Sequence, residues 1–208
     1  MLGVPRFGLS RRARVVKRAF DLTGSALLLV GLGPLLALIA LAVKLTSPGP
    51  VFFRQTRIGR DAEPFAMLKF RSMIDGADRA KDGLRGRNEA DGLFKIADDP
   101  RITRVGRMLR ATSLDELPQL LNVVRGEMSL VGPRPLVPDE DSQIKGWHRR
   151  RLQLTPGMTG PWQVLGSTRI PLREMVKIDY LYVANWSLWE DVKIMLRTIV
   201  CVLARRGI

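Results

Sequence analysis

The stretch that decides the fold is residues 21–50, "DLTGSALLLVGLGPLLALIALAVKLTSPGP". It carries no charged side chain from Leu22 to Val43, a run of 22 residues. As one continuous helix this run is about 33 Å long, enough to cross a bilayer hydrocarbon core of about 30 Å. The run therefore predicts a helix that enters a membrane.

Three interpretations compete for this run. A signal peptide needs a small-residue cleavage site after the apolar core, and "VKLTSPGP" offers no good one. A single spanning helix and a re-entrant helix pair both fit. Pro34, preceded by Gly31 and Gly33, kinks the segment near its middle, as re-entry requires, although spanning helices are also commonly kinked. Basic residues on both flanks favour a cytoplasmic position for both ends. These flanking residues are Arg11, Arg12, Arg14, Lys17 and Arg18 before the run, and Lys44, Arg54, Arg57 and Arg60 after it.

The charge balance restricts the chemistry. Lys and Arg number 34 against 20 Asp and Glu, giving a formal charge of +14, which favours anionic partners such as phosphates, an anionic membrane or nucleic acid. With one histidine, His148 in the basic run "KGWHRRR", and one cysteine, the chain cannot build a His/Cys zinc cluster. Enzymatic chemistry here would rest on carboxylates, arginines and lysines.

Beyond residue 50 the pattern becomes that of a compact domain. Two short β-prone runs near 51–57 and 65–70 predict a hairpin. Residues 99–111 predict a short basic helix, and residues 114–126 predict a second helix closed by Gly126.

The remaining segments predict turns and a final helix. The Gly/Pro-rich stretches 128–140 and 154–167 predict rigid turns. The segment from Ser187 is amphipathic and begins with a capping box completed by Glu190. The expected fold class is α/β, mainly helical: an N-terminal re-entrant or spanning helix, then a compact domain with a small β-hairpin and amphipathic helices.

The pair Asp115–Glu116 in "TSLDELPQLLN", residues 112–122, stands out in so basic a chain. Asp115 as an N-cap would place Pro118 in the first helical turn, and Ser113 as the cap would make Glu116 part of a capping box. The alternative is a reactive carboxylate, kept ionised by the helix dipole and nearby arginines, that suits a nucleophile or a metal ligand. The spacing alone leaves the structural and functional interpretations open.

Three basic residues are candidates for holding an anion. Arg110 is the arginine nearest the carboxylates, Arg134 is fixed between prolines in "GPRP", and Lys69 lies in the second β-prone run, where an edge-strand role is the alternative. Arginines at every third position predict a solvated or membrane-facing stripe. They are Arg101, Arg104, Arg107 and Arg110.

Several motifs in order resemble the bacterial sugar transferase family, the monotopic phosphoglycosyl transferases. They are "KFRSM", "DPRITRVGRMLRATSLDELPQLLNVVRGEMSLVGPRP" and "RLQLTPGMTGPWQVLG". The resemblance runs from about Lys17 to the C-terminus. It implies transfer of a phosphosugar from a UDP-sugar to polyprenyl (undecaprenyl) phosphate with release of UMP, as the first membrane step of exopolysaccharide or other glycoconjugate synthesis.

The resemblance also implies residue roles. Asp115 would be the covalent nucleophile and Glu116 the second member of its dyad. Magnesium would be the cofactor, with Asp115 and then Glu116 as its candidate ligands. Lys69, Arg110 and Arg134 would bind substrate phosphate, with Arg107 as a further candidate. The helix would be re-entrant, broken at Gly33 and Pro34.

One position departs from the expected pattern. Ser167 stands where small family members often carry an arginine, and Arg169, two residues on, is a candidate replacement. The chain resembles a natural short form or an isolated catalytic domain.

The organisation that follows is a basic cytoplasmic N-terminus (1–20), a re-entrant membrane helix (21–46) and a catalytic domain (47–208). The expected location is monotopic, on the cytoplasmic face of the bacterial inner membrane. Anionic lipids, and interfacial contacts by Tyr180, Tyr182, Trp186 and Trp189, would hold it there. A homo-oligomer is a candidate assembly. The alternatives are an inactive membrane scaffold of a glycan-assembly complex and a basic nucleic-acid binder. No recognised nucleic-acid motif is present, so nucleic acid is not an expected partner.

Overall fold

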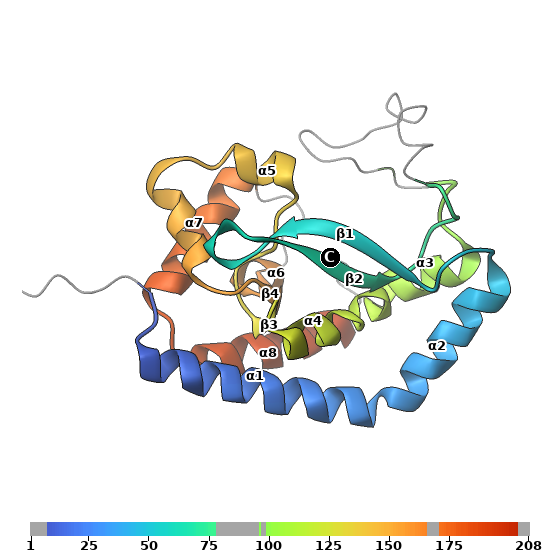
Figure 1. Cartoon of the computed structure of the whole chain (residues 1–208), viewed down its shortest axis with the longest axis horizontal. Coiled ribbons are helices and arrows are strands. Elements are labelled where there is room, and N and C mark those ends of the chain that lie inside the picture. The colour runs from blue at the N-terminus through green and yellow to red at the C-terminus, as the bar shows by residue number, and fades with distance from the viewer. Residues whose placement is uncertain (1–7, 78–95, 97–98, 166–170, 204–208) are drawn as a thin grey trace, which may run out of the picture.

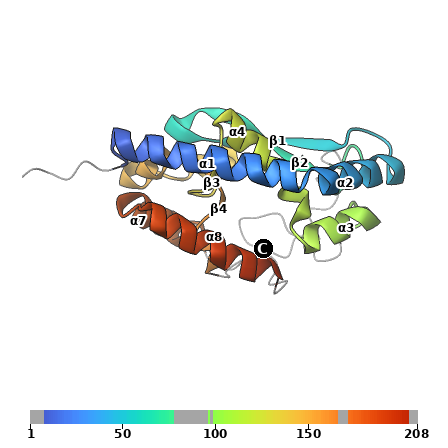
Figure 2. The ribbon, with the colours of Figure 1, turned by 90° about the horizontal axis from the view of Figure 1, so that it is seen from below.

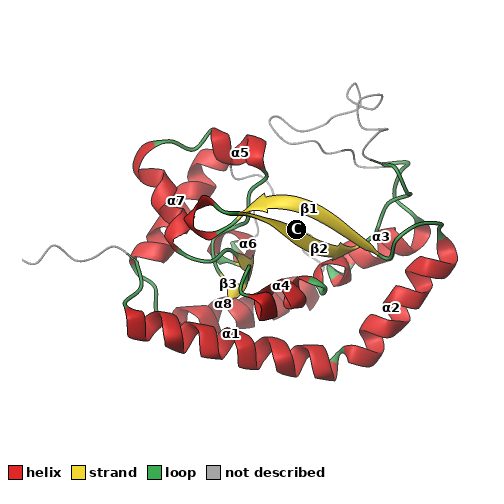
Figure 3. Ribbon diagram, in the orientation of Figure 1, coloured by secondary structure: helices red, strands yellow, loops and turns green. Residues whose placement is uncertain are grey.

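The computed structural model describes residues 8–77, 96, 99–165 and 171–203 (Figure 1). These residues are mainly helical, with two small two-stranded sheets, as Figure 3 shows by colour. This confirms the mainly helical α/β class expected from the sequence. Part of the polar segment after residue 71, residues 78–95 and 97–98, lies outside the described residues.

The element bounds are as follows. The strands are β1 (Phe52–Ile58), β2 (Pro64–Phe70), β3 (Ser129–Val131) and β4 (Gly157–Thr159). The α-helices are α1 (Arg11–Gly31), α2 (Gly33–Thr46), α3 (Arg104–Ala111), α4 (Gln119–Arg125), α5 (Pro138–Ser142), α6 (Pro161–Val164), α7 (Leu172–Ala184) and α8 (Leu188–Leu203). Short 3₁₀ helices cover Arg60–Ala62, Leu114–Glu116 and Gly146–Gln153.

Helices α1 and α2 meet at a sharp bend of 64°. The break is at Leu32, and Pro34 lies in the first turn of α2, where its missing N–H removes no helical hydrogen bond. Among the described residues no individual helix has the length and apolar character to cross a bilayer, whereas this bent pair does by length and composition. Helix α1 begins at Arg11, so the expected boundary at residue 20 falls inside one continuous helix.

Strands β1 and β2 form the hairpin that the sequence predicts near residues 51–57 and 65–70. The strands pair antiparallel, with Phe53 opposite Lys69 and Arg57 opposite Phe65. Met67, Leu68 and Phe70 of β2 are buried. Because side chains alternate between the two faces of a strand, Lys69 leaves β2 on the face opposite Leu68 and Phe70, which is the face that it shares with Met67.

The second sheet was not predicted. Strands β3 and β4 pair parallel, Ser129 with Gly157 and Val131 with Thr159, inside the two stretches that the sequence indicated as turns. Each strand has only three residues, too few for a period-two pattern to show. A Cβ on Gly157 would lie 2.0 Å from the backbone nitrogen of Gly132, so only glycine allows this close approach.

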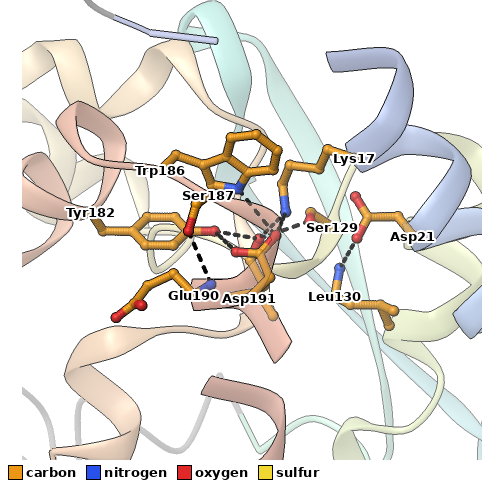
Figure 4. Close-up of polar contacts among 10 residues, drawn as sticks. Lys17, Asp21, Ser129, Leu130, Tyr182, Trp186, Ser187, Glu190 and Asp191 are labelled. Atoms are coloured by element: carbon orange, nitrogen blue, oxygen red, sulfur yellow. Dashed lines mark hydrogen bonds and ion pairs between the residues drawn. The ribbon is translucent and has the colours of Figure 1, made fainter. Parts of the chain in front are cut away.

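A buried ion pair joins α1 to α8 (Figure 4). Lys17 Nζ lies 2.6 Å from Asp191 Oδ2 and also donates to the carbonyl of Val131 at 2.9 Å. Both side chains are at most 5% exposed. Helix α1 therefore docks on the domain through a charge contact. Figure 2 shows α1 and α2 following each other along the length of the molecule.

Two aromatics expected at a membrane interface belong to this cluster instead. Tyr182 is buried and donates from its hydroxyl to Asp191 at 2.5 Å, and Trp186 Nε1 donates to the same carboxylate at 3.1 Å. A buried carboxylate needs such donors, which explains why these two rings face inward. Trp189, by contrast, is exposed. The Ser187 hydroxyl oxygen accepts from the backbone nitrogen of Glu190, which is one of the two hydrogen bonds of the predicted capping box, while the Glu190 carboxylate pairs with Lys193.

Replacing Asp191 by asparagine tests the role of this ion pair. Asp191→Asn removes the charged partner that lies 2.6 Å from the buried Lys17, so we expect a loss of about 3 kcal/mol in the free energy of unfolding. Glu190→Gln is the matched control: it breaks the half-exposed pair with Lys193 next door and should cost under about 1 kcal/mol. Denaturant unfolding in detergent measures both, and equal losses would contradict the assignment.

Candidate active site

The Asp115–Glu116 pair lies in the 3₁₀ helix Leu114–Glu116, between α3 and α4. Neither capping arrangement suggested by the sequence forms. Ser113 adopts a left-handed conformation (φ 55°) without a side-chain cap, and α4 begins only at Gln119, after Pro118. Because Pro118 has no N–H for a helical hydrogen bond, it lies just before the first residue of α4. The carboxylates lie in the separate 3₁₀ turn that precedes it. The two carboxylates are therefore not explained as helix caps.

Lys69 and Glu116 form an ion pair across 47 residues of sequence. Lys69 Nζ lies 2.6 Å from Glu116 Oε1, and the two side chains are 23% and 27% exposed. Lys69 is thus directed at the carboxylate pair rather than at solvent from an edge strand. Asp115 is the chain neighbour of Glu116, and the charges of both Lys69 and Glu116 affect its pKa.

Asn122 fixes the strand that carries Lys69 against the helix that follows the carboxylates. Its Oδ1 accepts from the backbone nitrogen of Leu68 at 3.0 Å, and its Nδ2 donates to the carbonyl of Ala66 at 2.8 Å. The side chain is fully buried and acts as an extra strand segment beside β2. This contact sets the relative position of Lys69 and the carboxylates.

Burial raises the pKa of Asp115 to about 6. Desolvation is the main cause; Glu116 raises the pKa further, whereas Lys69 and Arg110 lower it. The sequence predicts that neighbouring arginines and a helix dipole favour the ionised form of this carboxyl, which would lower its pKa. That expectation is wrong in direction, because Asp115 is 8% exposed and the loss of water outweighs the nearby positive charges.

A basic pocket lies beside Glu116. It is lined by Lys69 and Glu116, by Arg57 from β1, and by Arg134 and Pro135 from the loop after β3. Gln119, Trp162 and Gln163 add polar groups, and Met67, Gly157 and Met158 complete the lining. Asp115 itself does not line this pocket. Three cationic side chains against one carboxylate make the pocket suited to an anionic ligand.

The walls of this pocket hold several polar atoms without a protein partner. They are Arg57 Nε, Gln119 Nε2, Trp162 Nε1 and Gln163 Oε1, all buried. Leaving such a group unpaired costs about 1–3 kcal/mol, so four around one pocket indicate a surface prepared for a polar ligand or bound water.

Arg57, Gln119 and Trp162 were not predicted as site residues. Burial lowers the pKa of the Arg57 guanidinium, with Glu140 and Glu116 opposing the effect and Arg134 adding to it. In the sequence Arg57 is one of several arginines after an apolar run, with no local signal to separate it. Only the pairing of β1 with β2 and the fold of the 132–135 loop bring it beside Glu116 and Arg134.

The predicted basic residues divide into two groups. Lys69 and Arg134 line the pocket, whereas Arg110 and Arg107 are exposed on α3; Arg110 still affects the charge state of Asp115. Arg101 does not continue the stripe: it precedes α3 and is buried against Asp99, with Nη2 2.6 Å from Oδ2. Ser167 and Arg169 lie outside the described residues.

Asp115 and Glu116 are also the carboxylates that the sequence offers as magnesium ligands. Within residues 8–77, 96, 99–165 and 171–203, no three or more His, Cys, Asp and Glu side chains gather as a metal-binding group. Two adjacent carboxylates remain an acceptable donor set for Mg²⁺, because this ion is commonly held by one or two carboxylates, substrate phosphates and water. Asp115 and Glu116 fit that description.

The chain belongs to the bacterial sugar transferase family, whose model matches residues 12–205. It is 43% identical to the galactosyl transferase CpsE of Streptococcus agalactiae, over 93% of this chain and 43% of that protein. It is 45% identical to a UDP-glucose:undecaprenyl-phosphate glucose-1-phosphate transferase of Caulobacter vibrioides, over 96% of this chain and 73% of the relative. It is 43% identical to the exopolysaccharide production protein ExoY of Sinorhizobium fredii, over 93% of this chain and 88% of that protein. The chain thus spans less than half of CpsE, and most of ExoY.

The raised pKa of Asp115 predicts a pH-dependent stability. Between the ordinary value of 3.8 and about 6 the folded chain binds more protons than the unfolded chain, so stability falls as the pH rises through this window. The loss should total about 3 kcal/mol and be absent in Asp115→Asn.

Carboxyl ¹³C NMR of aspartate-labelled protein in detergent measures the titration directly, with Asp115→Asn providing the assignment. We expect a midpoint near pH 6. A midpoint at or below the ordinary aspartate value would show that the local positive charges outweigh burial.

Proposed function

We propose that this protein transfers a sugar-1-phosphate from a UDP-sugar to undecaprenyl phosphate and releases UMP. The observation that carries the proposal is the buried Asp115 next to the Lys69–Glu116 ion pair, at a pocket with three cationic side chains. Relatives whose names state this chemistry support it, among them the glucose-1-phosphate transferase of Caulobacter vibrioides. A role in exopolysaccharide synthesis is consistent with the name of ExoY.

The proposed reaction has two displacements at one phosphorus atom. A carboxylate oxygen of Asp115 attacks the β-phosphorus of the UDP-sugar, the bond from that phosphorus to the bridging oxygen breaks, and UMP leaves with the electron pair. An oxygen of the lipid phosphate then attacks the same phosphorus and the bond to Asp115 breaks, which regenerates the carboxylate. With a pKa of about 6, Asp115 is mostly ionised at pH 7 and more basic than an ordinary aspartate, which favours attack.

The basic residues would hold the phosphates in place. Lys69, Arg57 and Arg134 line the pocket and would offset the charge of the diphosphate. Arg110, exposed beside the carboxylates, is a candidate for the lipid phosphate. Mg²⁺ held by Asp115 and Glu116 would neutralise further phosphate charge. Arg169 and Arg107 remain candidate contacts from the sequence.

The bent helix pair would place this site at the membrane. Its far ends contact the same domain: Lys17 binds Asp191, and Val43 of α2 packs with Phe70 of β2. A pair that enters a bilayer between two such anchors must leave on the side it entered, which favours re-entry over spanning. The pair also exposes a row of large apolar side chains, namely Leu27, Leu28, Val30, Leu35, Leu38, Leu41 and Leu45.

The proposed location is the cytoplasmic face of the bacterial inner membrane, in a monotopic arrangement with residues 47–208 as the catalytic domain. The charge of +14 favours the anionic lipids of that leaflet. A soluble nucleotide-sugar and a membrane-embedded lipid phosphate can meet at this interface, which gives the helix pair a function in catalysis.

UMP release tests the proposed activity. The full chain in lipid nanodiscs, with undecaprenyl phosphate, Mg²⁺ and a panel of UDP-sugars, should release UMP with at least one donor. Asp115→Asn should reduce the rate at least about 1,000-fold, since it removes the attacking oxygen's charge. Asp61→Asn is the matched control. This exposed aspartate lies in the turn between β1 and β2 and does not line the pocket, so its replacement should leave the rate unchanged.

Two outcomes would contradict the proposal. UMP release that persists in Asp115→Asn would keep the enzyme but reject Asp115 as its nucleophile. A folded, membrane-bound protein that releases no UMP with any donor would favour the scaffold.

A further inference from the structure

One arginine of the basic run "WHRRR" is not a surface residue. Arg151 is 1% exposed and is the largest fully buried side chain in the described part of the chain. It pairs with Asp179 of α7, which has no exposed surface at all. The proposed reaction uses neither residue, and a buried ion pair is weak evidence for stabilisation, because apolar replacements are often as stable. The pair therefore calls for another explanation.

The pair holds both backbone polar groups of one residue, Arg134. Arg151 donates from Nε to Asp179 Oδ2 at 3.1 Å and from Nη2 to the same oxygen at 2.8 Å. Nη2 also donates to the carbonyl oxygen of Arg134. The backbone nitrogen of Arg134 in turn donates to Asp179 Oδ2 at 3.3 Å. Arg134 is thus held on its N–H side by the carboxylate and on its C=O side by the guanidinium.

This backbone contact controls where the Arg134 side chain points. Pro133 and Pro135 already restrict the loop, and the Gly132 nitrogen is bonded to Thr159 at 2.9 Å. Arg134 is the one residue between the prolines, and its guanidinium carbon lies 4.4 Å from the centroid of the Trp162 ring. Both Arg134 and Trp162 line the basic pocket. With the backbone clamped, the guanidinium reaches the pocket with little freedom left to lose on binding.

We propose that Arg151 and Asp179 are positioning residues that direct Arg134 into the pocket for the phosphates of the donor. This inference rests on the proposed function, because it assigns Arg134 a contact with the UDP-sugar. Arg151 and Asp179 do not touch the substrate and act only through the Arg134 backbone.

Hydrogen exchange tests the clamp without reference to activity. Prolines carry no amide, so a peptide spanning residues 130–136 reports few amides, one of which is that of Arg134. We expect faster exchange in this peptide in Asp179→Asn and in Arg151→Lys. The lysine keeps the charge but lacks the fork that reaches both Asp179 and the Arg134 carbonyl. Arg151→Lys therefore also serves if Asp179→Asn does not fold.

A neighbouring ion pair provides the matched control. Asp141 is also buried, at 6% exposed, and pairs at 3.2 Å with the more exposed Arg149, which belongs to the same 3₁₀ helix as Arg151. Among the described residues no hydrogen bond of this pair reaches Arg134. Asp141→Asn should leave exchange in residues 130–136 and the kinetics unchanged. If Asp141→Asn changed exchange and kinetics as much as Asp179→Asn does, the effect would be explained by general destabilisation, and the proposal would be overturned.

Kinetics test whether the clamp acts through Arg134. Asp179→Asn and Arg151→Lys should lower kcat/KM for the UDP-sugar by about 10- to 100-fold, the effect of misplacing a binding group by about 1 Å. In an Arg134→Ala background, Asp179→Asn should cost less than about threefold more, because the group it positions is already gone. The full loss repeated in that background would show an effect independent of Arg134 and overturn the proposal.

The two readouts separate the possible failures. Unchanged exchange in both Asp179→Asn and Arg151→Lys would reject the clamp, whatever Arg134→Ala does. Faster exchange with a kcat/KM unaffected by Arg134→Ala would keep the clamp and reject the assignment of Arg134 to donor binding. We expect three results together. Arg134→Ala lowers kcat/KM, Asp179→Asn and Arg151→Lys speed up exchange, and the effects of Asp179→Asn and Arg134→Ala are not additive in the double variant.

Discussion

The contact between Lys69 and Glu116 is the interaction on which the site depends. At 2.6 Å it ties the β-hairpin to the turn that carries the carboxylates, and so places a cation beside the buried Asp115. Lys69 and Arg110 both lower the pKa of Asp115 and so oppose the effect of burial, which raises it. The ion pair keeps a desolvated carboxyl within reach of ionisation, a useful state for a nucleophile.

Two buried polar contacts give this pair its geometry. Asn122 bonds the edge of β2 to α4, so that Lys69 and the carboxylates cannot shift relative to each other without breaking two hydrogen bonds. On the other side of the pocket, Arg151 and Asp179 hold the peptide of Arg134. The short parallel sheet β3–β4 brings Arg134, which follows β3, beside Trp162, which follows β4. Residues far apart in the chain therefore converge on one basic pocket.

The sequence predicted the elements with strong local signals. The helix break near Pro34, the hairpin, the end of α4 at Gly126 and the start of α8 after Ser187 follow from proline, glycine and capping patterns, and the structure confirms them. Helices α3 and α4 are also present, but they begin at Arg104 and Gln119 rather than at residues 99 and 114. It also singled out Lys69 and Arg134, both of which line the pocket.

What the sequence could not predict depends on burial. The three-residue strands of the second sheet were too short to show a pattern, and Arg57 has no local feature that distinguishes it from other arginines. Tyr182 and Arg151 look like surface residues in sequence and are buried by distant partners, Asp191 and Asp179. For the same reason the direction of the Asp115 pKa shift was wrong: the charges nearby can be counted in a sequence, but the loss of water cannot.

The central claim is that Asp115 becomes covalently linked to the phosphosugar. The most direct measurement is mass spectrometry of the protein after mixing with its UDP-sugar and Mg²⁺ in the absence of lipid acceptor, with acid quenching and peptide mapping. We expect a mass increase equal to one sugar phosphate on the peptide that contains Asp115, lost on addition of undecaprenyl phosphate. Turnover with both substrates but no adduct on any peptide, or an adduct on Glu116 instead, would contradict the account.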